Sequence, residues 1–179
     1  ESQNMMNSEM FSQFRKEFLE YIGRAEAVVI TSHFSPDDDS IGSVLFVYTF
    51  LTEHFPKKSI RIIYTGACPD RYKVFPRFEK IEWVHDVAEH LEGVDTLVTV
   101  DASNFRRFSA IPEKLAEVPV RIGFDHHASI ADDYTLLLHR KEYSSNTELL
   151  VRALCAEETP SRDLAEYALL GILGDTGNY

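Results

Sequence analysis

The spacing of apolar residues predicts how the chain begins. Five apolar side chains recur at helical spacing between Ser8 and Gly23, so this stretch is expected to form an amphipathic helix that the glycine closes. Residues 1–7 are left outside the predicted fold, because the chain starts without a methionine and shows no such pattern there. The pattern changes at Ala27, where a short β-branched run to Ser32 predicts a strand buried on both faces.

Strand-like and helix-like stretches alternate along the rest of the chain. Further strands are predicted over Ser59–Tyr64, Ile81–Val84, Asp95–Val100 and Val118–Phe124. Further helices are predicted over 40–51, where Ser40 can cap the first turn, and over Asp86–Leu91, Pro112–Glu117, Glu142–Ala156 and Arg162–Leu173. Repeated strand–helix units predict an α/β domain, with a mostly parallel sheet and helices on both faces.

Composition narrows the class of protein. With 179 residues, 44% of them hydrophobic, the chain is expected to fold as one domain. Its formal net charge of −11 argues against long duplex nucleic acid as a partner. Bound cations would neutralise a cluster of carboxylates, however, so a small phosphate ester remains compatible with this acidity.

The cysteines and the lack of long apolar runs bear on the compartment. Cys68 and Cys155 have no C-x-x-C partner, which argues against a disulfide framework or a thiolate zinc site and favours a reducing cytoplasm. No stretch approaches the roughly 20 apolar residues that cross a bilayer. The first residues also lack the pattern of a signal peptide, so no membrane attachment is expected.

Polar residues gather directly after three of the predicted strands. Strand 27–32 is followed by His33 and Asp37-Asp38-Asp39, strand 95–100 by Asp101, and strand 118–124 by Asp125-His126-His127. Ligands bind outside the carboxyl ends of the strands in open parallel sheets, so these side chains are expected to meet at one rim. Each group alone has a plainer explanation: a helix N-terminus, a turn residue, or two histidines that are neighbours by chance. One shared site explains the pattern better than three coincidences.

The donor types at this rim favour a pair of divalent metals. Phosphoryl transfer needs cations that neutralise the non-bridging oxygens and generate hydroxide near neutral pH, and two metals about 3.5–4 Å apart do both. Asp101, a lone carboxylate on a central strand, suits a ligand that both ions share. Oxygen and imidazole donors without thiolate favour manganese first, then magnesium, although zinc or cobalt can compete in vitro.

Several dispersed motifs together resemble those of the DHH phosphoesterases. They are His33-x-x-Pro36-Asp37-x-Asp39-Ser40-Ile41-Gly42-Ser43, Val100-Asp101, Asp125-His126-His127 and Gly171-Ile172-Leu173-Gly174-Asp175-Thr176-Gly177. This family includes RecJ-type exonucleases, family II inorganic pyrophosphatases, and the oligoribonuclease and phosphoadenosine-phosphate phosphatases. The resemblance spans roughly residues 25–179, and motifs in the family's order are more specific than any one alone.

The resemblance implies a set of metal ligands. Matched by position, His33 and Asp37 hold one metal, Asp39, His126 and Asp175 hold the other, and Asp101 bridges both. Asp125 is implied to orient an imidazole, as carboxylates do behind metal-bound histidines. His127 is implied to contact the phosphate or to protonate the leaving group.

Two further segments resemble the oligoribonuclease branch of the family. An arginine six residues after the bridging aspartate sits near the active site there, and Arg107 holds that position, with an ordinary surface cation as the alternative. Ser144 and Ser145 lie in a Ser/Thr-rich segment that precedes an apolar helix in this branch, and they are expected to bind substrate.

These features lead to one hypothesis and two alternatives. The leading hypothesis is manganese-dependent hydrolysis of short oligoribonucleotides or of small nucleotides, such as phosphoadenosine phosphate or dinucleotides. Inorganic pyrophosphatase, which Asp39-Ser40-Ile41 also resembles, is the first alternative. A non-catalytic nucleotide-binding module of the same fold is the second. The sequence leaves a homodimer open.

The chain departs from the family's pattern in two places. Asp38 stands where the family usually has a small or neutral residue, which adds a carboxylate beside the site. Family members also continue into a smaller C-terminal substrate-binding domain, which these 179 residues do not include. Residues 25–179 are therefore expected to be an isolated catalytic lobe, with residues 1–24 as a tail and helix packed on it.

Overall fold

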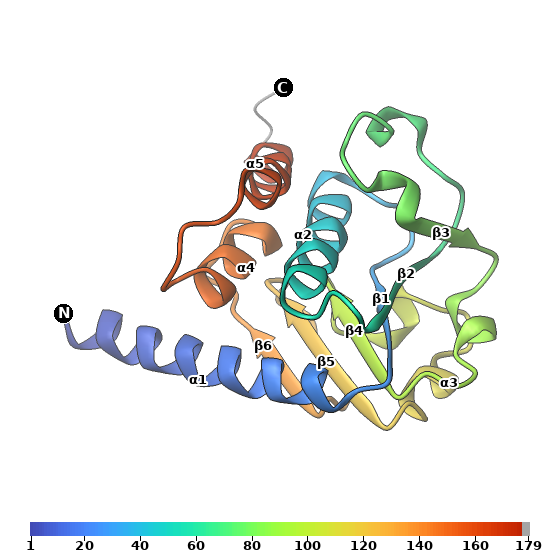
Figure 1. Ribbon diagram of the computed structural model, residues 1–179, viewed down its shortest axis with the longest axis horizontal. Helices are drawn as coiled ribbons and strands as arrows, with labels where there is room; N and C mark the ends of the chain where they lie inside the picture. The colour runs from blue at the N-terminus through green and yellow to red at the C-terminus, as the bar shows by residue number, and fades with distance from the viewer. Residues whose placement is uncertain (177–179) are drawn as a thin grey trace.

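The computed structural model contains a six-stranded parallel sheet with helices packed around it (Figure 1). It describes residues 1–176, and for residues 175 and 176 it describes only the backbone. The strands are β1 (Ala27–Thr31), β2 (Ser59–Thr65), β3 (Ile81–Val84), β4 (Thr96–Val100), β5 (Val120–Asp125) and β6 (Leu136–His139). The α-helices are α1 (Ser2–Arg24), α2 (Asp38–His54), α3 (Pro112–Ala116), α4 (Asn146–Leu154) and α5 (Arg162–Thr176). Short 3₁₀ turns are η1 (Asp70–Tyr72), η2 (Phe78–Lys80), η3 (Val87–His90) and η4 (Phe105–Arg107).

The two faces of the sheet are covered by different kinds of element. Helices α1, α2, α4 and α5 pack on one face, where they enclose the larger apolar cluster (Figure 1). The other face carries a smaller cluster beneath η3, η4 and α3. On the first face, Phe14 and Phe18 of α1 both meet Phe124 of β5 edge-on, with ring centroids 5.2 Å apart. The predicted α/β class, with a parallel sheet and helices on both faces, is confirmed.

Three predicted helices begin differently in the structure. Helix α1 starts at Ser2 instead of near Ser8, because its polar first turns contain no helix breaker and need no buried face. Helix α2 is capped by Asp37, and Ser40 is the third residue of its first turn. Helix α4 starts at Asn146, after the capping residue Ser145, four residues later than predicted.

Two other elements departed from the prediction. Residues 87–90 form a 3₁₀ turn in place of a helix, and the side chain of Asp86 accepts a hydrogen bond from the Ala88 N–H at its start. Strand β6 was not predicted at all. It has four residues, lies at the edge of the sheet and pairs only with β5, so its short run carries little periodic signal.

Two further observations concern the state of the cysteines and the possibility of a membrane-spanning helix. Cys68 is exposed, Cys155 is buried, and both are free. Within residues 1–176, no helix combines the length and the apolar character that crossing a membrane requires.

Candidate metal centre

The order of the strands places the candidate site at the middle of the sheet. From β1 the chain proceeds outward through β2 and β3, and it then returns to β4, on the other side of β1, before continuing to β5 and β6. Loops that leave such neighbouring strands diverge, and this switch point is where open α/β sheets bind ligands. His33 follows β1, Asp101 follows β4, and His126 follows β5. The predicted gathering of strand-end residues is therefore present.

Asp101 lies between two pairs of side chains. Nε2 of His33 is 3.1 Å from Oδ2 of Asp101 and 3.7 Å from Oδ2 of Asp37. Nε2 of His126 is 3.2 Å from Oδ1 of Asp101 and 3.3 Å from Oδ2 of Asp39. We call these pairs the His33 half (His33 and Asp37) and the His126 half (His126 and Asp39). Asp101 presents one oxygen to each half.

Backbone carbonyls orient the imidazole of each half. Nδ1 of His33 donates to the carbonyl of Phe34 at 2.8 Å, and Nδ1 of His126 donates to the carbonyl of Tyr143 at 3.2 Å. Because a carbonyl oxygen only accepts, Nδ1 carries a hydrogen in both rings. In the neutral ring this leaves the Nε2 lone pair facing Asp101. Metal-ligating histidines are commonly held in this way.

The backbone and carboxylate of Asp101 are both unusual. Its φ is 63°, in the left-handed region that residues other than glycine seldom adopt, and such strain is concentrated at functional sites. The side chain is buried, and its Oδ1 has no aligned hydrogen-bond donor among the residues that the structure describes. A buried carboxylate oxygen without a well-aligned donor is costly, and a cation beside it, the imidazolium of His126 or a bound metal, would offset that cost.

The first turn of α2 carries the carboxylates of both halves. Oδ1 of Asp37 accepts from the Ser40 N–H at 2.8 Å, and the Ser40 hydroxyl oxygen accepts from the Asp37 N–H at 2.9 Å. Asp39 instead points into the protein. Its Oδ2 accepts from the Asn146 N–H at 2.8 Å, and its Oδ1 accepts from the Thr147 N–H at 3.1 Å. Asp39 thus lies at the N-terminus of α4, where a negative charge is stabilised.

Asn146 and Gly171 complete the surroundings of the His126 half. The Asn146 amide, oriented so that its oxygen meets donors, accepts from Ser43 Oγ at 3.1 Å and from the Asp101 N–H at 3.3 Å. It also donates to the Phe124 carbonyl at 3.1 Å. Helix α5 passes so close that a Cβ at Gly171 would lie 2.7 Å from Oδ1 of Asp39. The sequence placed Gly171 in a family motif, but it assigned neither residue a role at the site.

Asp125 orients His127, which belongs to neither half, and does not orient His33 or His126. Its Oδ1 accepts from the His127 N–H at 3.0 Å and from Nδ1 of the same residue at 2.8 Å, while its Oδ2 accepts from Ser103 Oγ at 2.6 Å. The His127 side chain is 41% exposed, so its Nε2 remains for a substrate atom. His139 of β6, which was not predicted, donates from Nε2 to the His127 carbonyl and lies 3.6 Å from Oδ2 of Asp125.

Opposite charges dominate the electrostatics of the site. Burial alone would lower the pKa of His126, but Asp101 and Asp39 outweigh it and raise that pKa to about 11. Burial likewise would raise the pKa of Asp101, but His126 and His33 hold it at about 2. The pKa of His33 is raised against burial, mainly by Asp101. Without metal, each imidazolium proton therefore faces a carboxylate, and a metal binding at these nitrogens would have to displace it.

The other predicted site residues have the following positions. Arg107 is exposed, and its backbone carbonyl accepts from the Phe34 N–H at 2.7 Å, so it borders the loop after His33. The Ser144 hydroxyl donates to Glu148 at 2.8 Å, and the Ser145 hydroxyl accepts from the Glu148 N–H at 3.1 Å. Both serines thus support the start of α4, and substrate contacts by them remain a prediction. The side chain of Asp175, in the last turn of α5, lies outside the described residues.

The donors fit two small divalent cations. One group with ligand atoms within 4.8 Å of one another is His33, Asp37 and Asp101, and another is Asp101, His126 and His127. The shared Asp101 is what a bridged pair of ions requires. His127 is the weaker candidate ligand, because its Nδ1 is 3.9 Å from Asp101 but 2.8 Å from Asp125. The oxygen and imidazole donors suit manganese, magnesium or cobalt.

Known proteins resemble this chain along most of its length. Residues 27–172 match the family described as "DHH family, N-terminal domain". The "Bifunctional oligoribonuclease and PAP phosphatase NrnA" of Thermus thermophilus is 32% identical over 158 residues, which are 85% of this chain and 44% of that protein. The "Probable bifunctional oligoribonuclease and PAP phosphatase NrnA" of Streptococcus mutans is 26% identical over 166 residues, 92% of this chain and 50% of that protein.

A solved structure agrees with these relatives. The crystal structure of an exopolyphosphatase-related protein from Bacteroides fragilis superposes with a TM-score of 0.82 at 29% identity, over 93% of this chain and 51% of that one. The chain therefore spans about half the length of the proteins that it matches.

Proposed function

Because this chain belongs to the DHH family as its N-terminal domain, we propose that it is the metal-binding lobe of a two-metal phosphoesterase. The main observation that supports this proposal is that Asp101 presents one oxygen to each of two imidazole–carboxylate pairs. The proposed substrates are short oligoribonucleotides and small nucleotides such as phosphoadenosine phosphate, and the names of two relatives support that class. The proposed metal is manganese, with magnesium or cobalt as alternatives.

The proposed ligands follow the two halves of the site. His33 and Asp37 hold one ion, Asp39, His126 and Asp175 hold the other, and Asp101 contributes to both. When bound, two such ions supply positive charge for the non-bridging phosphate oxygens and lower the pKa of a water molecule. Asp101 and the backbone carbonyls behind the two histidines keep the donors in place before substrate arrives.

His127 and Asp125 are the proposed proton-transfer pair. Asp125 accepts from Nδ1 of His127, which fixes the orientation of the ring. As the phosphorus–oxygen bond to the leaving group breaks and a bond to the attacking oxygen forms, Nε2 of His127 gives its proton to the leaving oxygen. Arg107, Ser144 and Ser145 are proposed to contact the substrate at the edge of the same site.

Parallel assays with Mn²⁺ test this proposal against its alternatives. We expect the chain to release nucleoside monophosphate from a dinucleotide and inorganic phosphate from phosphoadenosine phosphate, and to act weakly on pyrophosphate. Activity on pyrophosphate alone would assign a pyrophosphatase instead. Nucleotide binding without turnover of any of the three would leave only a binding module.

Substituting the shared carboxylate tests the two-metal arrangement. Asp101→Ala is expected to reduce turnover by at least about 100-fold, because neither ion keeps its full ligand set. Titration calorimetry should show two Mn²⁺ ions per wild-type chain and fewer for this variant. Asp133→Ala, at a side chain that is 98% exposed, is the control for losing a carboxylate. Unchanged turnover in Asp101→Ala would contradict the proposal.

A further inference from the structure

The loop of residues 66–77 leaves the sheet beside the metal centre. It follows β2, the neighbour of β1, so it emerges at the same rim as His33. The loop is held at several points. Tyr72 is 2% exposed, the Tyr167 hydroxyl donates to the Pro76 carbonyl at 2.5 Å, and Arg77 bonds Asp163 of α5 at 2.5 Å. Side chains on this loop therefore have defined positions.

Asp38, which departs from the family's pattern, bonds to this loop and not to the metal centre. The Tyr72 hydroxyl donates to Oδ1 of Asp38, which is 8% exposed. Nη2 of Arg71 lies 3.5 Å from the same oxygen and 2.5 Å from the Tyr72 hydroxyl, and the guanidinium stands 4.7 Å above the Tyr72 ring. Asp38 lies between Asp37 and Asp39 at the N-terminus of α2, so Arg71 is held beside the helix turn that supplies one carboxylate to each half of the site.

The ion pair of Arg71 with Asp38 accounts for little of the stability of the fold. The Arg71 side chain is 68% exposed and its contact with Asp38 is long, and exposed pairs of this kind contribute little stability. Asp38 also keeps the Tyr72 hydroxyl as a donor if Arg71 is removed. Within residues 1–176, only Nη2 of Arg71 makes hydrogen bonds, so Nε and Nη1 are left to bind a ligand.

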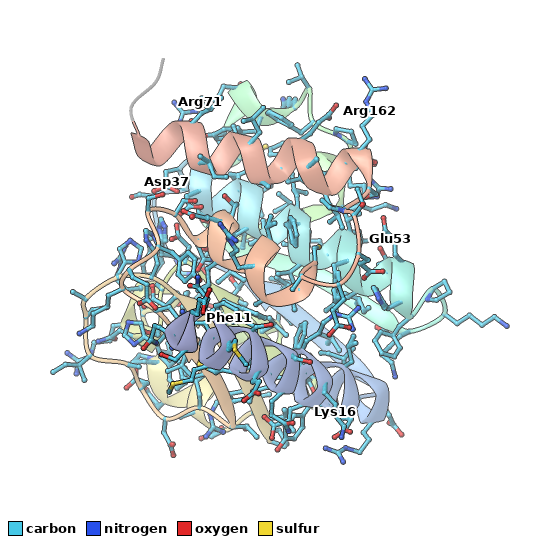
Figure 2. The ribbon with its side chains drawn as sticks, turned by 90° about the vertical axis from the view of Figure 1, so that its left-hand side faces the viewer. Phe11, Lys16, Asp37, Glu53, Arg71 and Arg162 are labelled. Carbon is cyan, nitrogen blue, oxygen red and sulfur yellow. The ribbon has the colours of Figure 1, made fainter. Side chains whose placement is uncertain are left out.

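The chemistry of the site indicates which ligand those donors meet. The chain carries a formal charge of −11, and carboxylates surround the candidate centre, so an anionic substrate gains from a cation at the rim. A guanidinium offers parallel N–H groups that match the oxygens of a phosphate. Figure 2 shows Arg71 and Asp37 near one end of α5, with Arg162 at the other.

We propose that Arg71, positioned by Asp38 and Tyr72, binds a second phosphate group of the substrate, next to the one that is hydrolysed. This inference rests on the proposed function and adds to it a specificity for substrates with two phosphates. Oligoribonucleotides and phosphoadenosine phosphate both carry such a group. Asp38 then supports substrate binding, although its charge alone would oppose it.

Substrates with one and two phosphates test the role of Arg71. We compare the 5′-phosphorylated dinucleotide pApA with bis(p-nitrophenyl) phosphate, which has a single phosphate, in the presence of Mn²⁺. Arg71→Ala should raise KM for pApA on the order of tenfold, with little change in kcat, and should leave KM for the single-phosphate ester within about twofold. The KM of Arg71→Lys for pApA should lie between those of the wild type and Arg71→Ala, because lysine keeps the positive charge but lacks the parallel N–H groups of the guanidinium. Arg162→Ala, at a side chain 91% exposed, is the matched control.

A binding measurement separates this inference from the proposed function. Calorimetric titration of the wild-type chain and Arg71→Ala with phosphoadenosine phosphate and Mn²⁺ needs no turnover. If the wild type binds but hydrolyses nothing, the proposed function fails, and weaker binding by Arg71→Ala still supports the inference. Equal KM changes for both esters, no change for either, or equal affinities of the two proteins for phosphoadenosine phosphate would overturn it. A wild type that neither binds nor hydrolyses contradicts both.

Discussion

The two halves of the candidate metal centre are built in different ways. In the His33 half, Asp37 is 53% exposed and bonds Ser40, three residues along the chain. In the His126 half, the Asp39 side chain is 1% exposed and bonds the start of α4, more than 100 residues away. The first half thus depends on local sequence and stays open to solvent. The second depends on packing between helices, which fixes its geometry.

The largest expected effect comes from disturbing the packing behind the His126 half. Gly171→Ala places a methyl group against Thr147 and 2.7 Å from Oδ1 of Asp39. Overpacking of this kind costs about 1–3 kcal/mol of unfolding free energy. We expect a loss near the upper end by urea denaturation, together with one Mn²⁺ ion fewer by calorimetry.

Gly23→Ala is the matched control for that variant. Gly23 lies in α1, and among the described residues its Cβ would meet Phe55 alone, at 3.7 Å, which is an ordinary van der Waals contact. It should therefore leave stability unchanged or raise it by a few tenths to about 1 kcal/mol. If both glycine variants behave alike, close packing of α5 is not what shapes the His126 half.

Matched substitutions of the two carboxylates should have smaller effects on stability. Asp39→Asn replaces an acceptor of two N–H groups with an amide whose NH₂ faces a donor, and we expect a loss of about 1–2 kcal/mol in the metal-free protein. Asp37→Asn should change stability by less than about 0.5 kcal/mol, because asparagine caps helices as well as aspartate does. Thermal unfolding in a chelator measures both. Equal losses would contradict the distinction between the halves.

The pH dependence of the metal-free protein tests the charge pairing in the His126 half. The pKa of His126 is raised from 6.5 to about 11, so the folded state holds this proton more tightly than the unfolded state does. Its contribution to stability is complete below pH 6.5 and is lost as the pH rises toward 11, at up to about 1.4 kcal/mol per pH unit for one proton. Urea denaturation at pH 7 and 9 should show the decline, and His126→Gln should flatten it.

The parts of the site that sequence could predict are those built by local signals. His33, Asp101 and His126 were found because each follows an apolar strand, and strand ends in a parallel sheet share a rim. Tertiary contacts determined what was missed. Asn146 meets Asp39 across 107 positions, and no periodic pattern records such a pairing. His139 went unnoticed because it ends β6, an edge strand too short to predict.

The same reasoning explains the errors at the helix starts. Ser40 is a good capping residue in isolation, but Asp37 takes that position, and the two side chains bond each other's backbone in a capping box. In the same way, Glu142 to Ser145 resembled the first turn of a helix, although α4 starts only where Ser145 caps it. Helix propensity predicted the regions of both helices correctly, but it predicted the wrong first residue for each.

The contact between Asp39 and α4 also sets an order of events during synthesis. Asp39 leaves the ribosome long before Asn146, Thr147 and Gly171 exist to surround it. The His33 half can form early, whereas the His126 half has to wait until α4 and α5 have been made and have docked. On the proposed assignment of ligands, loading of a second ion would therefore be a late step in the maturation of the chain, and an incomplete chain would offer metals only the open half.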